Sequence, residues 1–497
     1  MKNIKTNLLL FLMLVSLASC SDEFLDVNDS STNPPSSTPE LTLPAAQKYS
    51  ADMMYNANNA NNSFNLLGGI YAGVISDSGD RVWYQTEQSY IINNDTYQSL
   101  WNNTYTLALY SYDYVETFPE AGYDYYKAIA KIMKAYHFAA LVDMYGDIIY
   151  SEAFQRGENT QPAYDDDRAI YDAIYEQLNV AINMISNAGA NTKSVTTDVI
   201  LGGDMNAWQK FANTLKLRML LRQINTGEDL TAQYNELMNS GIGFIDSTVS
   251  VNPGYLDEAG KQNPFYAVHG FAPGGTTPGP NGGATRGSDT YIDFMTDNND
   301  PRVARLFLPV GGEYVGVPQN VYDNAYNSNL VSDLGPGIIN SSSQDAQLML
   351  LSEALFLQAE AAQRNLITGN AGDLYKAGIA ASFAELGVPN PVAAAADYES
   401  NSINPIINWE SADGIGNEIE AIITQKWIAG GFISGFEVWM DRVRTEFPSF
   451  VPIPVGAASA VFPSNLLYPT AELASNSANV PAQGANAAFD RHTFWMQ

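Results

Sequence analysis

Apolar side chains recur at steps of three and four residues over most of this chain, and this helical period constrains the fold more than any other feature. Residues 123–143 (YDYYKAIAKIMKAYHFAALVD) show it most clearly, with Ile129, Ile132, Met133 and Tyr136 on one face. Residues 100–118 repeat the pattern, and the helix-breaking turn PEAGYD separates the two. The spacing predicts a helix hairpin of about tetratricopeptide size.

Other segments continue this pattern along the chain. We expect helices over 167–186, 206–223, 348–364, 373–386, 419–430 and 436–443, with the first two and the next two forming pairs. Long stretches rich in Gly, Asn and Pro lie between the pairs, most clearly at 269–288, and residues 308–346 and 388–415 are also poor in helical pattern, so we expect no helices there. No alternation is strong enough to predict a large sheet, although short hairpins are compatible with the pattern. The predicted fold is mainly α, a tetratricopeptide-like scaffold of helix pairs with long irregular loops suited to ligand binding.

The N-terminus has the three-part layout of a secretory signal. Lys2 and Lys5 precede the apolar run LLLFLMLV, and LASC ends at Cys20, the only cysteine of the chain. This pattern resembles a bacterial lipobox, although a chance cysteine behind an ordinary signal is the simpler alternative. We predict a signal peptide over 1–19, a lipidated flexible tether over 20–45 that is acidic and then rich in Ser, Thr and Pro, and one domain over 46–497.

Composition and motifs exclude several classes of protein. The net charge of −30 repels phosphate backbones, so we expect no nucleic-acid partner. A single cysteine and three scattered histidines offer no zinc-ligand spacing, and neither a G-x-S-x-G elbow nor a P-loop occurs. Residues 165–167 (DDD) begin a predicted helix, where capping is favoured over weak calcium binding. We therefore predict no cofactor, no metal and no catalytic residues.

A series of motifs in order resembles one known family over nearly the whole chain. The motifs are DEFLDVN after the lipobox, TPELTLPAAQ, the stretch 125–154 ending in YGDIIYSEAF, PAYDDDRAIYDAIYEQL, GGDMNAWQKFANTLKLRMLLR, NDPRVARLFLP, LSEALFLQAEAAQRN, ITQKWIAGGFISGFEVWMDRVRTEFP, YPTAELASNSANV and the final FWMQ. On these residues the chain resembles the SusD/RagB family of Bacteroidetes surface lipoproteins, and most closely its SusD-like subgroup. Ile149 stands where the family usually has proline.

The resemblance implies a surface binding protein without catalytic activity. Family members bind an oligosaccharide, or less often a peptide, and act as a lid on a SusC-like TonB-dependent transporter of the outer membrane. The helix-pair scaffold is usually assigned to the transporter contact, and loops on the other side to the ligand. The acidic SDEFLD after Cys20 resembles surface-export signals, which implies an anchor facing outside the cell. The ligand loops differ most among members, so the resemblance does not name the ligand.

Residues 75–90 (ISDSGDRVWYQTEQSY) hold the side chains that sugar capture needs. Aromatic rings pack on the C–H faces of sugars, while carboxylates, amides and guanidinium groups bond the hydroxyls. We predict ligand contacts in this non-helical stretch and just before the glycine-rich loop 269–288. The predicted residues are Asp77, Asp80, Arg81, Trp83, Tyr84, Gln85, Tyr90, Tyr266 and His269. Packing of Trp83 and Tyr84 on the scaffold is the competing interpretation.

Other conspicuous residues are expected to serve the fold. Trp101, Trp208, Trp427 and Trp439 lie at helical spacing and are expected in the core. Arg218 and Arg222 lie four residues apart and are expected to pair with acids. The residues expected in a partly buried ion network are Glu437, Asp441, Arg442 and Arg444.

Three rival functions remain open from the sequence. The same architecture could capture peptides, as the RagB side of the family implies. A helix-rich glycoside hydrolase would need paired carboxylates, which 54 acidic residues could supply by chance, so their presence is no evidence. A purely structural lid with no ligand would follow if Trp83 and Tyr84 were both buried.

Overall fold

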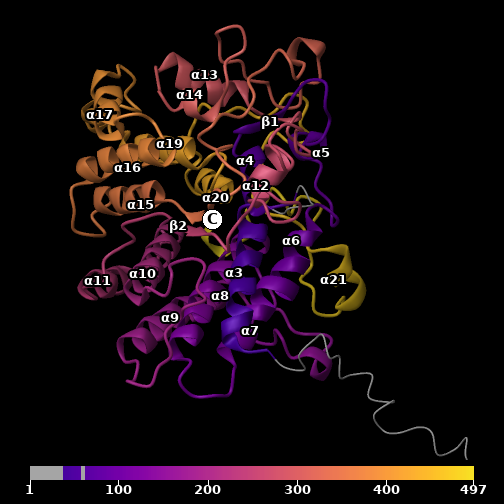
Figure 1. The fold of residues 1–497 in the computed structure, drawn as a ribbon, viewed down its shortest axis with the longest axis vertical. Helices are drawn as coiled ribbons and strands as arrows, with labels where there is room; N and C mark the ends of the chain where they lie inside the picture. Colours follow the sequence, from indigo (N-terminus) through magenta and orange to yellow (C-terminus); the bar gives the residue numbers. More distant parts are fainter. Residues whose placement is uncertain (1–36, 57–61, 497) are drawn as a thin grey trace, which may run out of the picture.

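The computed structural model describes residues 37–56 and 62–496, and Figure 1 shows their arrangement. The predicted signal peptide and the lipidation site Cys20 lie outside the described residues. Helix α3 (Pro39–Met54) begins inside the segment predicted as tether, so the boundary expected at residue 45 is wrong. Pro39 fits the first helical turn, and Leu43 and Ala46 are buried, which draws this segment into the domain.

The lower part of the molecule in Figure 1 is built from helix pairs. The predicted hairpin is formed by α7 (Tyr110–Glu116) and α8 (Asp124–Tyr145). Helix α8 also packs on α9 (Asp167–Ser186). The next helices along the chain are α10 (Met205–Arg222) and α11 (Thr231–Asn239). The predicted helices here are confirmed. The helix expected over 100–118 is divided into α6 (Gln98–Asn103), a π-helical turn η1 (Thr104–Leu109) and α7.

Capping side chains explain why two of these helices begin where they do. Asp166 accepts a hydrogen bond from the Ala169 N–H at 3.0 Å, and Asp204 accepts bonds from the first turn of α10. The capping role predicted for residues 165–167 is therefore confirmed at Asp166. The buried face of α9 includes Ile170 and Ile174, as its period predicts.

The upper part of Figure 1 contains the C-terminal helices. They are α15 (Leu351–Gln363), α16 (Ala371–Glu385), α17 (Pro391–Asn401), α18 (Trp409–Asp413), α19 (Glu418–Gly430) and α20 (Gly435–Thr445). The pairing of α15 with α16 is confirmed. The prediction that 388–415 lacks helices is wrong. Helix α17 begins with PVAAAA, whose alanines form helix readily but show little amphipathic contrast.

The remaining described helical elements are short. They are α4 (Phe64–Tyr71), α5 (Gln85–Gln88), α12 (Pro264–His269), α13 (Asp289–Asp297), α14 (Val303–Leu306), α21 (Thr470–Ser475) and the 3-10 turns η2 (Arg156–Glu158), η3 (Asn324–Tyr326) and η4 (Phe494–Met496). Helix α4 crosses α20 so closely that a Cβ on Gly68 would lie 2.4 Å from the Gly435 carbonyl carbon. Glycine at this crossing brings the backbone of α4 onto α20 and so fixes the start of the following strand.

The described strands form two small antiparallel sheets. Strand β1 (Ile75–Asp77) pairs with β3 (Thr285–Gly287), and β2 (Val249–Val251) pairs with β4 (Ala346–Met349). Each sheet joins segments that are far apart in sequence, so neither is the short hairpin that the sequence allowed.

The four tryptophans assigned to the core from the sequence are buried, as expected. None of the described helices is both long and apolar enough to cross a lipid bilayer.

Candidate functional site

The two segments predicted to contact a ligand are joined by the β1–β3 sheet. Asp77 lies opposite Thr285, and Ser76 lies opposite Arg286. Strand β1 leads into residues 78–90, and β3 ends the glycine-rich segment 269–288. The sheet therefore places the tryptophan-bearing loop beside the end of the glycine-rich segment, although 208 residues separate Asp77 from Thr285 in the sequence.

Five of the nine predicted contact residues reach the surface. Trp83 is 50% exposed, Asp80, Arg81 and Gln85 are exposed, and Tyr266 is half-buried. Gln85 opens the one-turn helix α5, so the stretch is not wholly non-helical as predicted. We call the exposed part of residues 80–91 the Trp83 surface. Val82 and Ile91 add exposed apolar side chains to it, at 63% and 54%.

The other four predicted residues are buried, and their prediction as direct contacts is wrong. Asp77, Tyr84, Tyr90 and His269 are each at most 2% exposed. Tyr90 has a φ of +56° and packs its ring 6.0 Å from that of Tyr71 in the core. Residue type alone did not distinguish these side chains from their exposed neighbours, because the backbone here has no regular period.

Tyr84 ties the Trp83 surface to the glycine-rich segment. Its Oη lies 2.7 Å from Thr285 Oγ1 and accepts a hydrogen bond from Asn281 Nδ2 at 3.0 Å. His269 Nδ1 reaches the same Thr285 hydroxyl at 2.9 Å, and burial lowers the pKa of His269 to about 3. The imidazole is therefore neutral at pH 7, and its contact with Thr285 supports the buried side of the loop that carries Trp83.

Asp77 supports the backbone directly beside Trp83. Its Oδ2 accepts hydrogen bonds from the Tyr84 N–H at 2.7 Å and from Tyr322 Oη at 3.3 Å. Its Oδ1 is buried and has no hydrogen bond to the described residues. Burial raises the pKa of Asp77 to about 7, against the lowering effect of those two bonds. Asp77 therefore supports the backbone of the loop and does not reach a ligand at the surface.

Neighbouring loops hold the Trp83 surface from its other sides. Asp80 accepts hydrogen bonds from the Ser328 N–H at 2.9 Å and from the Ser328 hydroxyl at 3.0 Å. Slight burial raises the pKa of Asp80, but these bonds outweigh it and the pKa is lowered. Gln88 accepts a bond from the Asn320 N–H, and Asn320 Nδ2 donates to the Val455 carbonyl at 2.6 Å. Sequence reasoning missed these loop residues, and no local pattern in the sequence marks them.

Arg81 is the exposed cation of this surface. Among residues 37–56 and 62–496, no side chain or carbonyl group bonds its guanidinium, whose Nη2 lies 3.8 Å from where a Cβ on Gly283 would stand. Tyr266 lies on α12, and its Oη is 3.9 Å from the corresponding position on Gly275. An exposed indole, a free guanidinium and the Gln85 amide form a surface suited to a sugar ring and its hydroxyls.

Comparison with known proteins identifies the family of this chain. A family model described as "Starch-binding associating with outer membrane" matches residues 33–469. The chain belongs to the SusD-like family. That description associates the family with the outer membrane. No curated protein matches the chain in sequence.

Solved structures share the fold of this SusD-like chain. A chitin-binding protein is 25% identical, with a TM-score of 0.68 over 89% of this chain and 95% of its own. A SusD homologue from Bacteroides uniformis is 26% identical, with a TM-score of 0.76 over 92% and 99%. A chitin-binding SusD homologue from Flavobacterium johnsoniae is 22% identical, with a TM-score of 0.74 over 92% and 98%, and shows the fold alone.

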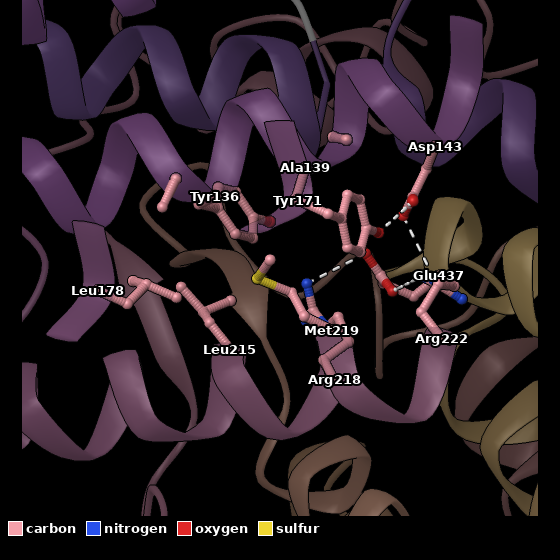
Figure 2. A pocket seen from close by; sticks show the side chains of 12 residues that line it. Tyr136, Ala139, Asp143, Tyr171, Leu178, Leu215, Arg218, Met219, Arg222 and Glu437 are labelled. Carbon is pink, nitrogen blue, oxygen red and sulfur yellow. Dashed lines mark hydrogen bonds and ion pairs between the residues drawn. The ribbon is translucent and has the colours of Figure 1, made fainter. Parts of the chain in front are cut away.

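The cavity in Figure 2 belongs to the core of this SusD-like fold. Arg218 Nη1 lies 3.0 Å from Glu437 Oε1, Arg222 Nη2 lies 2.5 Å from Glu437 Oε2, and Tyr171 donates to Asp143. The cavity measures about 20 Å³, room for about one water molecule, so it excludes a sugar. These contacts confirm the ion pairs predicted for the two arginines.

The same ion network continues along α20. Arg444 bonds both oxygens of Glu360 at 2.6 and 2.7 Å and reaches Asp441 at 3.0 Å, as the sequence predicted. The prediction for Arg442 is wrong, because its guanidinium donates to the carbonyls of Tyr71 and Val451 at 3.0 and 2.8 Å.

An acidic cluster lies at the start of α9. Asp147, Asp166 and Asp167 have carboxylate oxygens within 4.8 Å of one another. Each already accepts a backbone hydrogen bond, from the N–H groups of Asp167, Ala169 and Phe494 at 3.0, 3.0 and 2.7 Å. Their bonds serve the start of the helix and the C-terminal turn, so this cluster is explained without a metal ion.

Proposed function

We propose that this chain is a lipid-anchored surface protein that captures an oligosaccharide and passes it, chemically unchanged, to a SusC-like TonB-dependent transporter of the outer membrane. The observation that carries the proposal is the half-exposed Trp83 indole beside the unpaired Arg81 and the exposed Gln85. Sugar rings gain apolar burial against an indole, at roughly 25 cal/mol per Å², and bond the neighbouring polar groups.

The backbone that carries Trp83 is prepared for binding. Asp80 bonds Ser328 and Tyr84 bonds Thr285, which holds this backbone to two other segments, and Asp77 bonds the Tyr84 N–H within it. A binding surface that is ordered before the ligand arrives loses less conformational entropy on binding. These contacts support a recognition role and oppose the purely structural alternative, which required both Trp83 and Tyr84 to be buried.

Relatives and charge narrow the class of ligand. The chitin-binding protein that is 25% identical to this chain supports a glycan, and the family description names starch. A net charge of −30 repels polyanions, which favours a neutral glycan over an acidic one. Both named polysaccharides are consistent with a neutral or nearly neutral ligand.

The geometry of the Trp83 surface opposes catalysis. A glycoside hydrolase needs two accessible carboxyl groups on opposite sides of the scissile bond. Asp80 is exposed, with both oxygens bonded to Ser328, but Asp77 is buried behind the Tyr84 backbone, so these two acids do not form an accessible pair. Anchoring through Cys20 and delivery to the transporter rest on the resemblance of the N-terminus and of the whole chain to the family.

Calorimetry tests the capture proposal. The full chain, purified in detergent, is titrated with starch and chitin oligosaccharides, a panel of other glycans, and peptides, and the same samples are assayed for new reducing ends. We expect saturable glycan binding without products, and Trp83→Ala should weaken it at least about tenfold, or about 1.4 kcal/mol. Ile403→Ala is the control, because Ile403 is 99% exposed and follows the end of α17.

Each other outcome points to a rival. Binding of peptides alone would support the peptide-capturing alternative. New reducing ends would overturn the claim that the ligand is unchanged. Equal binding by the Trp83→Ala protein would move the site away from the Trp83 surface.

A further inference from the structure

A second recess lies among the helices of the lower part of the molecule, away from β1 and α5 in the upper part (Figure 1). It measures about 290 Å³, close to the lower limit of ligand pockets. Its walls come from α7, α8, α9 and the segment 150–154. The lining residues are Asp113, Glu116, Lys131, Lys134, Ala135, Phe138, Tyr150, Ser151, Ala153, Phe154, Ile174 and Gln177. We call it the α7–α9 cavity.

The rim of the α7–α9 cavity is charged but neutral overall. Lys134 Nζ lies 2.9 Å from Asp113 and 2.8 Å from Glu116, and Lys131 Nζ lies 2.6 Å from Glu116 and 2.7 Å from Gln177 Oε1. These two lysines and two acids are 16 to 20% exposed, so they face a partly dry space. A charged ligand would have to compete with these internal pairs, whereas a neutral polar ligand can use their remaining donors and lone pairs.

The opposite wall is aromatic and contains an unused donor. The Tyr150 ring lies 4.8 Å from the Phe138 ring, and Lys134 Nζ lies 5.3 Å from the centre of the Phe154 ring. The Tyr150 hydroxyl forms no hydrogen bond with any residue in the described part of the chain. Partial burial of the ring raises the pKa of this hydroxyl to about 12, so it is protonated at pH 7. Tyr150 is half-buried and its hydroxyl has no partner among the described residues, so a ligand can bond this hydroxyl in place of solvent.

The backbone beside this wall is held in an unusual conformation. Phe154 has a φ of +66° and Arg156 a φ of +57°, in the left-handed region that is unfavourable for side chains of this size. The Tyr105 hydroxyl donates to the Ile149 carbonyl at 2.6 Å, and Tyr105 belongs to the π-helical turn η1. Both strained backbone and π-helical turns concentrate at functional sites in proteins.

From these observations we propose that the α7–α9 cavity is a second saccharide site, which takes a neutral sugar unit independently of the Trp83 surface. The sugar hydroxyls bond the outer lone pairs of Asp113 and Glu116, the Gln177 amide and the Tyr150 hydroxyl. The aromatic wall contacts the C–H groups of the ring. Balanced rim charges exclude sugars that carry a carboxylate or an ammonium group.

Ligand-observed saturation-transfer NMR tests this site, because it detects weak binding. The probes are maltotriose and N,N′,N″-triacetylchitotriose, with glucuronic acid and glucosamine as charged counterparts. The full chain carries Trp83→Ala, so that the first surface does not contribute. Tyr150→Phe is added to remove the unpartnered hydroxyl, and Tyr314→Phe is the control because the half-buried Tyr314 also lacks a hydroxyl partner among the described residues.

We expect the Trp83→Ala protein to bind at least one neutral probe and neither charged sugar. Tyr150→Phe should weaken that binding about fivefold or more, the effect of one net hydrogen bond, without changing the unfolding temperature. Ala153→Phe, which places an aromatic ring inside the cavity, should abolish it.

Two results would overturn the second site. One is loss of all saccharide binding with Trp83→Ala, which would leave the first surface supported. The other is residual binding that both cavity substitutions leave unchanged.

Discussion

The pH dependence of stability should report directly on Asp77. This carboxyl group is 1% exposed, and its pKa of about 7 compares with an ordinary value of 3.8, mainly because burial disfavours its charged form. The folded protein therefore holds the Asp77 proton more tightly than the unfolded chain does. Stability from this group is complete below pH 3.8 and declines as the pH rises towards 7.

Asp77→Asn removes the charge and keeps an acceptor oxygen for the Tyr84 N–H and Tyr322 hydroxyl. Each pH unit between the two pKa values corresponds to about 1.4 kcal/mol. From pH 5 to pH 8, the wild-type protein should lose roughly 2.7 kcal/mol relative to the variant, because only the two units up to pH 7 contribute.

Urea denaturation at pH 5, 6, 7 and 8 measures this difference. Other groups that titrate are common to both proteins and cancel in the comparison, apart from the half-buried Glu87, whose charge acts on Asp77 and raises its pKa. Asp297→Asn is the control, since Asp297 is exposed. Parallel stability curves for the wild-type and Asp77→Asn proteins would refute the idea that a buried, proton-holding carboxyl group supports Trp83.

Two further predictions concern the ion network and the anchor. Arg444→Met should destabilise the fold by about 3–5 kcal/mol in urea denaturation, because it leaves the buried Glu360 and Asp441 without this partner. Arg491→Met, at an exposed pair with Glu446, should cost less than about 1 kcal/mol, and equal costs would contradict the burial argument. Cys20→Ala should move the protein out of the membrane fraction and abolish incorporation of a labelled fatty acid, whereas unchanged fractionation would remove Cys20 as the anchor.

Much of the helical scaffold could be predicted from the sequence because its signals are local. Residues 167–186 repeat apolar side chains at the helical period after a capping Asp166, and the structure has this helix with the same bounds. The arginines four residues apart on α10 face acids because an unpaired charge in a core is too costly. The tryptophans at helical spacing are buried for the same local reason.

The candidate binding surface depends on contacts that no local pattern encodes. Trp83 and Tyr84 are neighbours in sequence, yet one is half exposed and the other is bonded beneath the surface to Thr285. Which of the two turns inward is decided by the pairing of β1 with β3, whose partner residues are 208 positions apart. The sequence determined the helices, their caps and the kind of side chain available for binding. Only the tertiary structure decided which of those side chains reach the ligand, because long-range pairing sets burial where the backbone has no period.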